Sequence, residues 1–464
     1  MFAVKENFLS NDILNMKITD LKLEWKDKNV LIVGAGSTGL SCAEFLNKHN
    51  IFFTIIDSRE DLNYINKNID IVCGYFQEKY FSQADILIVS PGVSIKHPFI
   101  QDAINQGKEV IGDVELFCRL TDKPIIAITG SNGKSTVTTL VSEILNASNI
   151  TAKPGGNIGI PCLDLITTDS ETDCYVLELS SFQLETTFSL KAYASIILNI
   201  SEDHMDRYDS YSDYRDAKEK VLHNAENIIF NSDDDVISGI SLDYDANTIT
   251  FSLVNQKADF YIKQHDGNEV IYHNNIIIAD ISNIKLIGLH NKLNILAALS
   301  LCSVFDTDLK QTQNVINDFS GLEHRSQMVS TYKDLVWIND SKATNIGATS
   351  AALAGLSEHA VHLILGGQSK AQDFNDLVPA LTTNVKNIYV YGEDADLIID
   401  AIVNKIETNI VRVETLEQSI NLVASTAVKD DVILFSPACA SFDQFDNYMH
   451  RGESFIDSVK RLEC

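Results

Sequence analysis

Two glycine-rich loops in the N-terminal third of the sequence have the composition of phosphate-binding loops. The first covers residues 34–39, with glycine at positions 34, 36 and 39, and follows an apolar run at 29–33. Glycines let the backbone approach a pyrophosphate, and the N-terminus of a following helix stabilises its charge. Asp57 ends the next apolar run and suits a ribose hydroxyl. This pattern predicts a site for a nucleotide with a pyrophosphate, and both NAD and UDP satisfy it.

The second loop is of the P-loop type and joins an apolar run at 125–129 to a helical pattern. It consists of Thr129, Gly130, Ser131, Asn132, Gly133, Lys134, Ser135 and Thr136. Backbone amides and a lysine in such a loop bind phosphates, and the hydroxyl after the lysine suits Mg²⁺. The loop departs from the general P-loop pattern, because Ile128 stands where the first glycine is expected. We predict that Gly130 to Thr136 bind ATP.

Two further strand ends in the same segment carry candidate metal ligands. Glu178 follows the apolar run 175–177, and His204 lies just beyond the run 195–200. Ligands of open α/β sheets bind at the carboxyl ends of the strands, so both side chains are expected to face the nucleotide. Each also has an ordinary interpretation, Glu178 as a solvated strand end and His204 as a loop histidine. Their position beside a P-loop favours the functional interpretation.

The elements that must position these residues form three α/β series. A chain of 464 residues is too long for one hydrophobic core, so several domains are expected. The apolar runs interpreted as buried parallel strands are 29–33, 52–57, 70–73, 85–89, 109–111, 125–129, 174–179, 195–200, 227–231, 361–365, 387–391, 411–413 and 432–435. We predict an α/β protein of three domains, each on a mostly parallel sheet. They are a Rossmann-like domain at 1–113, a P-loop ATPase-like domain at 114–321 and a second Rossmann-like domain at 322–464.

One stretch of the central segment departs from the α/β pattern. Between about 248 and 286 short runs alternate, with turn signals at Asp266-Gly267 and Asn274-Asn275. We predict a small antiparallel patch there. A helix rich in leucine and alanine is expected to follow at 291–304.

The overall charge limits the partners of the protein. The formal net charge is −28, which repels nucleic acid and anionic lipid, so neither is expected to bind. An anionic ligand therefore needs local devices such as glycine loops, lysines or metal ions. The eight cysteines form no C-x-x-C pair and are interpreted as reduced thiols. Residues 1–20 contain no signal-peptide core, and no apolar run reaches 18 residues, so we expect a cytoplasmic protein without membrane insertion.

Several motifs resemble those of the Mur ligases, the ATP-dependent amide ligases of peptidoglycan synthesis. They are the P-loop, the stretch 178–185, the stretch 203–208 and the stretch 214–218. The resemblance covers nearly the whole chain apart from about 25 N-terminal residues. Within the family it is strongest for the members that add D-glutamate to UDP-N-acetylmuramoyl-L-alanine. The specific signals for this branch are the C-terminal stretches 321–325, 339–345 and 436–445.

The resemblance implies which nucleotide each domain binds. The N-terminal domain is expected to bind UDP rather than NAD, and one residue of the central domain, Asn157, is expected to contribute. The residues of the N-terminal domain expected to bind UDP are Ser37, Thr38, Gly39, Asp57, Arg59 and Gly92. The central domain is expected to bind ATP, with Asn291 and Asn294 on the adenine side. Arg325 and Asp340 are expected to reach the nucleotide from the C-terminal domain.

The implied reaction proceeds through an acyl phosphate, because an amine does not usefully attack a free carboxylate. The residues with implied catalytic roles are Lys134, Glu178, His204, Lys218 and Lys342. Two Mg²⁺ ions are expected to neutralise the crowded anions, with Ser135 and Glu178 suited to one and His204 to a second. By its sequence context alone Lys218 is a surface lysine in a charged helix. The resemblance implies instead that it is carbamylated and supports Mg²⁺.

For D-glutamate, the resemblance implies binding by lysines, hydroxyls and one aromatic ring, which are Lys342, Thr344, Lys370, Ser441 and Phe442. Two departures from the family pattern occur nearby. Gln368 and Ser369 replace an expected aspartate and glycine, and Tyr448 stands where phenylalanine is expected.

Three alternatives stay open at this point. An NAD-dependent oxidoreductase explains the first glycine loop but leaves the P-loop unexplained. Another Mur-type or folylpolyglutamate-type amide ligase differs in the amino acid or acceptor. A P-loop switch protein would hydrolyse ATP without any amino acid. For the ligase we expect a monomer, with UDP-N-acetylmuramoyl-L-alanine, D-glutamate and ATP as substrates.

Overall fold

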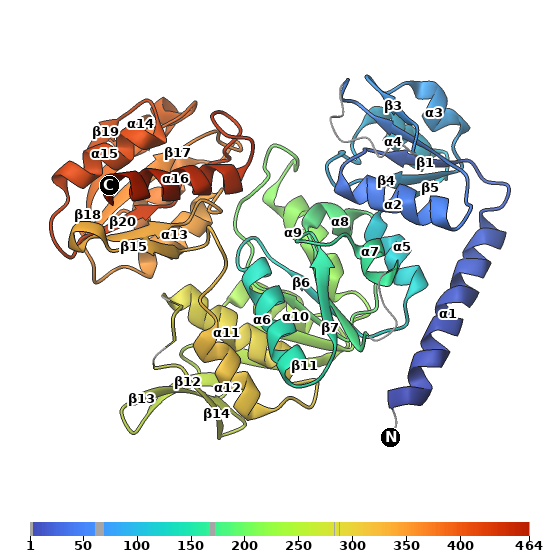
Figure 1. The fold of residues 1–464 in the computed structure, drawn as a ribbon, viewed down its shortest axis with the longest axis horizontal. Helices are drawn as coiled ribbons and strands as arrows, with labels where there is room; N and C mark the ends of the chain where they lie inside the picture. Colours follow the sequence, from blue (N-terminus) through green and yellow to red (C-terminus); the bar gives the residue numbers. More distant parts are fainter. Residues whose placement is uncertain (1–2, 61–68, 168–171, 283, 287, 464) are drawn as a thin grey trace.

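Three sheets lie in three successive parts of the chain, which Figure 1 shows as blue, green to yellow, and orange to red regions. The computed structural model describes residues 3–60, 69–167, 172–282, 284–286 and 288–463. The central part lies between the other two (Figure 1). The fold is therefore the expected three-domain α/β arrangement with mostly parallel sheets. The exact domain boundaries at 113 and 321 stay predictions.

The N-terminal sheet is parallel throughout, in the order β3-β2-β1-β4-β5. Its strands are β1 (Val30–Val33), β2 (Phe53–Asp57), β3 (Ile71–Cys73), β4 (Ile86–Val89) and β5 (Glu109–Ile111). Its helices are α1 (Ala3–Glu24), α2 (Ser37–Lys48), α3 (Glu78–Gln83), α4 (Pro98–Asn105) and α5 (Asp113–Leu120). The strand order reverses at β1, so the loop that leaves β1 opens onto the crevice where such sheets bind nucleotides.

The central sheet has the order β14-β13-β12-β11-β10-β9-β6-β8-β7. Its strands are β6 (Ile125–Thr129), β7 (Ala152–Gly156), β8 (Cys174–Glu178), β9 (Ala194–Ile197), β10 (Asn227–Asn231), β11 (Asn247–Ser252), β12 (Phe260–His265), β13 (Asn268–His273) and β14 (Ile276–Asp280). Its helical segments are α6 (Lys134–Ala147), α7 (Cys162–Thr167), α8 (Ser181–Glu185), α9 (Tyr211–Glu219), the 3₁₀ turn Lys220–Leu222, α10 (Asp235–Leu242), α11 (Leu289–Cys302) and α12 (Leu309–Asp318).

The expected antiparallel patch is correct for only part of its range. The strands β12, β13 and β14 pair antiparallel, as predicted. The prediction is wrong for β11, which pairs parallel with both β10 and β12 and so continues the main sheet. The first four residues of β11 are exposed or half-buried, so its sequence lacks the continuous apolar run that indicates a buried parallel strand.

The C-terminal sheet has the order β15-β16-β20-β17-β18-β19, and only β15 runs antiparallel. Its strands are β15 (Gln327–Ser330), β16 (Val336–Asn339), β17 (Val361–Gly366), β18 (Val385–Tyr391), β19 (Asn409–Arg412) and β20 (Val432–Phe435). Its helical segments are the 3₁₀ turn Tyr332–Asp334, α13 (Ile346–Ala354), the 3₁₀ turn Phe374–Ala380, α14 (Ala395–Ile402), α15 (Leu416–Thr426) and α16 (Tyr448–Glu463).

Most strands lie where the sequence predicts them. β5, β6, β10 and β20 have the predicted bounds, and the others agree within two residues, except that β9 ends at Ile197, three residues early. Three strands, β7, β15 and β16, were not predicted. The strand β7 contains Pro154 and two glycines, a composition tolerated at a sheet edge but not recognisable as a strand. The predicted helix at 291–304 is α11, shifted by two residues.

Packing joins the N-terminal and central domains more tightly than it joins the C-terminal domain to them. One apolar cluster includes Ile32 and Cys42 of the first domain together with Leu177 and Leu222 of the second. The C-terminal sheet has separate clusters on its two faces. The C-terminal domain is therefore positioned largely by the polar contacts of the site below.

The seven cysteines that the structure describes are free thiols, as predicted, and Cys464 lies outside the described residues. Over the described ranges, no helix combines the length and the apolarity needed to cross a membrane.

The helix α1 precedes the first sheet and packs against α5 (Figure 1). Ile18, Leu21 and the following Trp25 are buried in the shared cluster, while Lys17 donates to the carbonyl of Thr121 and pairs with Asp122. Both of these partners lie between α5 and β6. The end of α1 therefore braces the connection between the first two domains.

Trp25→Ala is expected to lower the free energy of unfolding by about 3–5 kcal/mol, because it empties a fully buried site. The matched control is Leu23→Ala, whose side chain is 69% exposed and whose loss should cost less than about 0.5 kcal/mol. Urea unfolding of the two variants measures the difference. Equal midpoints would mean that the end of α1 contributes nothing to stability.

Candidate active site between the three domains

The first cavity lies at the carboxyl ends of β1, β2 and β4. Five of its predicted UDP-binding residues line it from the N-terminal domain and one from the central domain, namely Ser37, Thr38, Asp57, Arg59, Gly92 and Asn157. Gly39 does not line it. A Cβ at Gly39 would lie 1.9 Å from the carbonyl oxygen of Gly34, so this glycine is needed for the close packing of α2 on the loop.

Asp57 is a fixed anion at the wall of this cavity. Its two carboxylate oxygens accept from the Arg59 guanidinium at 2.8 Å each and from the backbone amides of Ala35 and Arg59. Burial raises the pKa of Asp57, but the bonds from Arg59 and the backbone outweigh it and lower the pKa to about 2. Ser58 and Ser90 also line the cavity and were missed, since lone serines carry no sequence signal.

The P-loop lysine folds back onto its own loop. Lys134 Nζ donates to the carbonyl oxygens of Gly130 at 2.7 Å and Ser131 at 3.0 Å. Gly133 before it has a φ of +83°, and a Cβ there would lie 2.6 Å from the side-chain oxygen of Asn294. Only glycine combines this left-handed backbone with such a close neighbour. The start of α6 and the start of α11 therefore meet directly.

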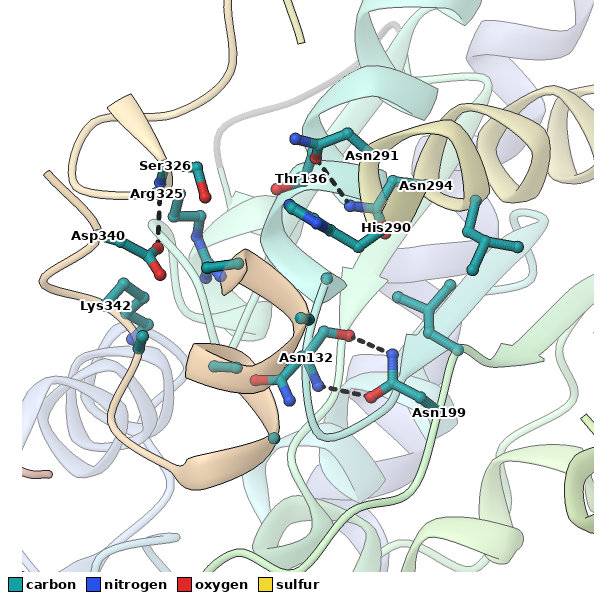
Figure 2. Close-up of a pocket in the computed structure, with 18 of the residues that line it drawn as sticks. Asn132, Thr136, Asn199, His290, Asn291, Asn294, Arg325, Ser326, Asp340 and Lys342 are labelled. Atoms are coloured by element: carbon teal, nitrogen blue, oxygen red, sulfur yellow. Dashed lines mark hydrogen bonds between the residues drawn. The ribbon is translucent and has the colours of Figure 1, made fainter. Parts of the chain in front are cut away.

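The second cavity lies between these two helices and the C-terminal domain. Figure 2 shows Thr136 next to Asn291 and Asn294 at the top of the cavity, Asn132 at the bottom, and Arg325 with Asp340 at the left. All the residues predicted for ATP line this cavity or the adjoining one, except Gly130 and Ser135. The lining residues Asn199 and His290 were missed, although Asn199 Oδ1 accepts from the Asn132 amide at 2.8 Å (Figure 2).

Arg325 and Asp340 bring the C-terminal domain to the P-loop. The Arg325 guanidinium donates to the Ser135 hydroxyl across the domain boundary. Asp340 accepts from the Ser326 amide at 3.0 Å and the Ser436 hydroxyl at 2.8 Å, and burial raises the pKa of Asp340 to about 6. Ser135 is thus buried beneath the arginine rather than lining a cavity.

The third cavity adjoins the second and contains the predicted catalytic residues, Lys134, Glu178, His204, Lys218 and Lys342. Glu178 Oε1 accepts from Asn157 Nδ2 at 2.7 Å, and its Oε2 is buried without a hydrogen-bond partner among the described residues. Burial raises the pKa of Glu178, but Lys134 and Arg325 outweigh it and hold the pKa low. A buried carboxylate oxygen with no donor fits a cation ligand.

His204 has the protonation state that a metal ligand requires. Burial lowers its pKa to about 4, so the imidazole is neutral at pH 7. Its ring packs edge-on against Phe182 at 4.9 Å. Within the described residues no group of three or more His, Cys, Asp or Glu side chains is arranged to hold a metal. A second metal here would therefore need a further anionic ligand.

Lys218 is buried, so its interpretation as a surface lysine is wrong. It is 2% exposed, its Nζ donates to the carbonyl of Gly130 at 2.8 Å, and the ammonium lies over the Tyr214 ring. Burial first, and Lys134 second, lower the pKa of Lys218 well below its usual value. The burial of Lys218 was not predicted from the sequence, because α9 is strongly charged and its buried face consists of only Tyr214, Ala217 and Lys218.

The predicted D-glutamate residues also line the third cavity, namely Lys342, Thr344, Lys370, Ser441 and Phe442. Lys370 Nζ pairs with Asp203 of the central domain at 2.9 Å and donates to the Thr344 hydroxyl at 3.2 Å. Asn345 donates to the other oxygen of Asp203 at 3.1 Å. Asp203 was missed by the sequence analysis, and its position next to His204 is the signal that could have identified it.

The loop before Lys370, in which Gln368 and Ser369 depart from the family pattern, is held by hydrogen bonds of its backbone. Gln368 and Ala440 exchange two backbone hydrogen bonds at 3.0 and 2.8 Å, and the Ser369 amide donates to Asp394 at 2.6 Å. The identities of Gln368 and Ser369 therefore do not prevent Lys370 from reaching the cavity.

Comparison with known proteins identifies the family. Three family models match, the MurD-like N-terminal domain of Mur ligases at residues 28–112, the Mur ligase middle domain at 128–302 and the Mur ligase glutamate ligase domain at 324–439. The chain therefore belongs to the Mur ligase family.

Individual relatives agree over nearly their whole length. The chain is 42% identical to a UDP-N-acetylmuramoylalanine–D-glutamate ligase of Haemophilus influenzae, covering 94% of this chain and 99% of the relative. It is 41% identical to the protein of that name from Pasteurella multocida, covering 95% and 100%. Among solved structures, an ADP complex of the MurF ligase of Thermotoga maritima has a TM-score of 0.62 at 14% identity, covering 94% of this chain and 97% of that one. At this identity the structural likeness supports the fold alone.

Proposed function

We propose that this protein joins D-glutamate to UDP-N-acetylmuramoyl-L-alanine at the expense of ATP, in peptidoglycan precursor synthesis. The observation that carries the proposal is that three cavities adjoin in the order the reaction needs. Asn157 lines both the first and the third cavity, and Asn132, Arg325 and Lys342 line both the second and the third. A substrate carboxylate, a terminal phosphate and an incoming amine can therefore meet in the third cavity.

The acceptor binds with its UDP in the first cavity. Ser37 and Thr38 at the start of α2 face the pyrophosphate, where the helix N-terminus favours negative charge. Asp57 accepts a hydroxyl or amide donor of the nucleoside, and its low pKa keeps it a pure acceptor. Asn157 orients the acyl end toward Glu178 and the P-loop.

ATP binds in the second cavity and phosphorylates the acceptor carboxylate. Lys134 and the amides of the P-loop hold the phosphates, while Asn291 and Asn294 contact the adenine side. Arg325, already at Ser135, supplies a second cation next to the transferred group. The products of this step are ADP and an acyl phosphate, in which the carboxylate oxygen has become part of a good leaving group.

Mg²⁺ fits the residues on two grounds, the unpartnered oxygen of Glu178 and the neutral imidazole of His204. Ser135 and Glu178 would hold one ion, and His204 with carbamylated Lys218 would support a second. When bound, the metal neutralises charge on the phosphates and on the carboxylate.

D-Glutamate binds on the C-terminal side of the third cavity. Lys342 and Lys370 face its two carboxylates, with the hydroxyls of Thr344 and Ser441 as further donors. Its neutral amine attacks the acyl carbon and the C–N bond forms. Inorganic phosphate leaves with the C–O bond electrons, and the attacking nitrogen loses one proton. Excess positive charge from Lys134, Arg325, Lys342 and Lys370 makes this site favourable for anions on an otherwise acidic protein.

We also infer that the enzyme acts in the cytoplasm as a monomer. Two of the three proposed substrates are nucleotides, and the described cysteines are free thiols, as in a reducing compartment. All the groups assigned above come from one chain.

Phosphate release from ATP is expected to require both UDP-N-acetylmuramoyl-L-alanine and D-glutamate, with L-glutamate a poor substitute. A phosphate assay over a panel of D- and L-amino acids measures this, with the no-amino-acid reaction as the control. Equal turnover with L-alanine would place the protein in another branch of the family. Turnover with no amino acid would contradict a ligase and favour a P-loop switch.

A further inference from the structure

Lys342 stands at the boundary between the ATP cavity and the reaction cavity, and it lines both. Its ammonium lies 3.9 Å from the centroid of the Tyr448 ring. In the described part of the chain, no ion pair and no hydrogen bond of the Lys342 side chain accompanies this contact. The face of Tyr448 is therefore the direct support of the charged group.

The surroundings of Lys342 make such support necessary. Arg325, Lys134 and Lys370 are the neighbouring cations, and Glu178 is the neighbouring acid. Burial, followed by Arg325, lowers the pKa of Lys342 to about 7. An aromatic face attracts a cation most strongly where water is excluded. The ring thus offers electron density to an ammonium that is both desolvated and repelled.

The ring is itself held in place by the helix that carries it. Tyr448 is the first residue of α16, and its carbonyl accepts from the Ser341 hydroxyl at 2.8 Å. One turn later, the fully buried Arg451 donates to the Ser341 carbonyl at 2.7 Å, to the Ser341 hydroxyl at 3.0 Å and to the Ala440 carbonyl at 3.1 Å. The start of α16 is therefore fastened to the loops that carry Lys342 and Ser441.

We propose that Tyr448 is a positioning residue, whose ring seats the Lys342 ammonium so that it faces the bound D-glutamate and the acyl phosphate together. This inference rests on the proposed function. Without the ring, Lys342 has no fixed partner and several rotamers, so ordering it would reduce the binding energy available to the amino acid. The hydroxyl of Tyr448 is not required by this role.

Steady-state kinetics of Tyr448→Leu and Tyr448→Phe in the full chain test the proposal. Tyr448→Leu is expected to lower kcat/KM for D-glutamate about 10-fold or more, mainly through KM, because the cation–π contact is lost. Tyr448→Phe keeps the ring and should stay within about 3-fold of the wild type. A loss of the same size in Tyr448→Phe would assign the effect to the hydroxyl and overturn the proposal.

A double-mutant cycle with Lys342→Met shows whether Tyr448 acts through Lys342. Calorimetric titration of D-glutamate, with the UDP substrate and a non-hydrolysable ATP analogue present, makes the cycle independent of turnover. In the Lys342→Met background, Tyr448→Leu is expected to cause no further loss of affinity. If the two substitutions reduced the affinity for D-glutamate independently, so that their fold losses multiplied in the double variant, the proposal would be overturned.

The same experiments separate this inference from the function on which it rests. Wild-type enzyme without D-glutamate-dependent phosphate release refutes the proposed function. If the wild-type enzyme is active and Tyr448→Leu has the same KM for D-glutamate, only the positioning role is refuted. Unchanged affinity of Tyr448→Leu for the UDP substrate, together with an unchanged melting temperature, excludes a general folding defect.

Discussion

Lys218→Ala is expected to lower the turnover number on the order of 10³-fold, which corresponds to about 4 kcal/mol of transition-state stabilisation. The reason lies in the burial of Lys218 beside Gly130 and in its strongly lowered pKa. In the proposed carbamylation the neutral amine of Lys218 attacks CO₂, a C–N bond forms and the nitrogen loses a proton. The product is an anionic oxygen ligand in the cavity that Glu178 and His204 also line. Initial rates of phosphate release measure the effect.

Rescue by small carboxylates distinguishes a carbamate from a merely structural lysine. Acetate or formate that enters the space left by Lys218→Ala replaces the carbamate oxygens, so part of the rate should return. Amines should not restore it, because the missing group donates electron pairs. Lys220→Ala is the matched control, since Lys220 lies two residues away, donates to the Glu185 carbonyl and is not among the residues that line the third cavity. A fully active Lys218→Ala enzyme would refute the carbamate.

Lys134→Ala is expected to reduce turnover by at least about 10³-fold while leaving the affinity for the UDP substrate nearly unchanged. Lys134 belongs to the P-loop and lines the third cavity, whereas the first cavity is built from Ser37, Asp57 and their neighbours. The cation that holds the phosphates can therefore be removed without touching the UDP site. Phosphate release and calorimetric binding of the UDP substrate together give the two quantities.

The exposed Lys310 on α12 provides the control for this second variant. Lys310→Ala removes one positive charge from the same domain and should alter neither quantity. A folded Lys134→Ala protein that no longer binds the UDP substrate would mean that the two phosphate loops do not serve different ligands.

The burial of Lys218 and the contact of Lys342 with the Tyr448 ring have a common physical basis. Four cations, Lys134, Arg325, Lys342 and Lys370, gather around one cavity of a protein whose net charge is −28. Their mutual repulsion is offset partly by Glu178 and Asp203, and partly by the Tyr448 ring. The proposed substrates bring further negative charge, so binding them relieves this repulsion.

Features whose residues lie close together along the chain could be predicted from the amino-acid sequence. The glycine spacing at 34–39, the P-loop at 129–136 and the strand ends at Asp57 and Glu178 are local patterns, and apolar periodicity reports buried strands directly. The three α/β series were therefore predictable. The residues expected in the UDP and D-glutamate sites were inferred from the resemblance of motifs, which also depends on short runs of residues.

Contacts between residues that are far apart in the sequence became known only from the three-dimensional structure. Lys370 and Asp203 are 167 positions apart, and no local sequence pattern predicts their ion pair. The charged composition of α9 suggested a solvated helix, yet packing against the P-loop buries Lys218. Strand β7 is stabilised by pairing with β8 rather than by its own propensity. In each case the free energy comes from packing between elements, and this depends on the three-dimensional arrangement of the chain rather than on the neighbours of a residue in sequence.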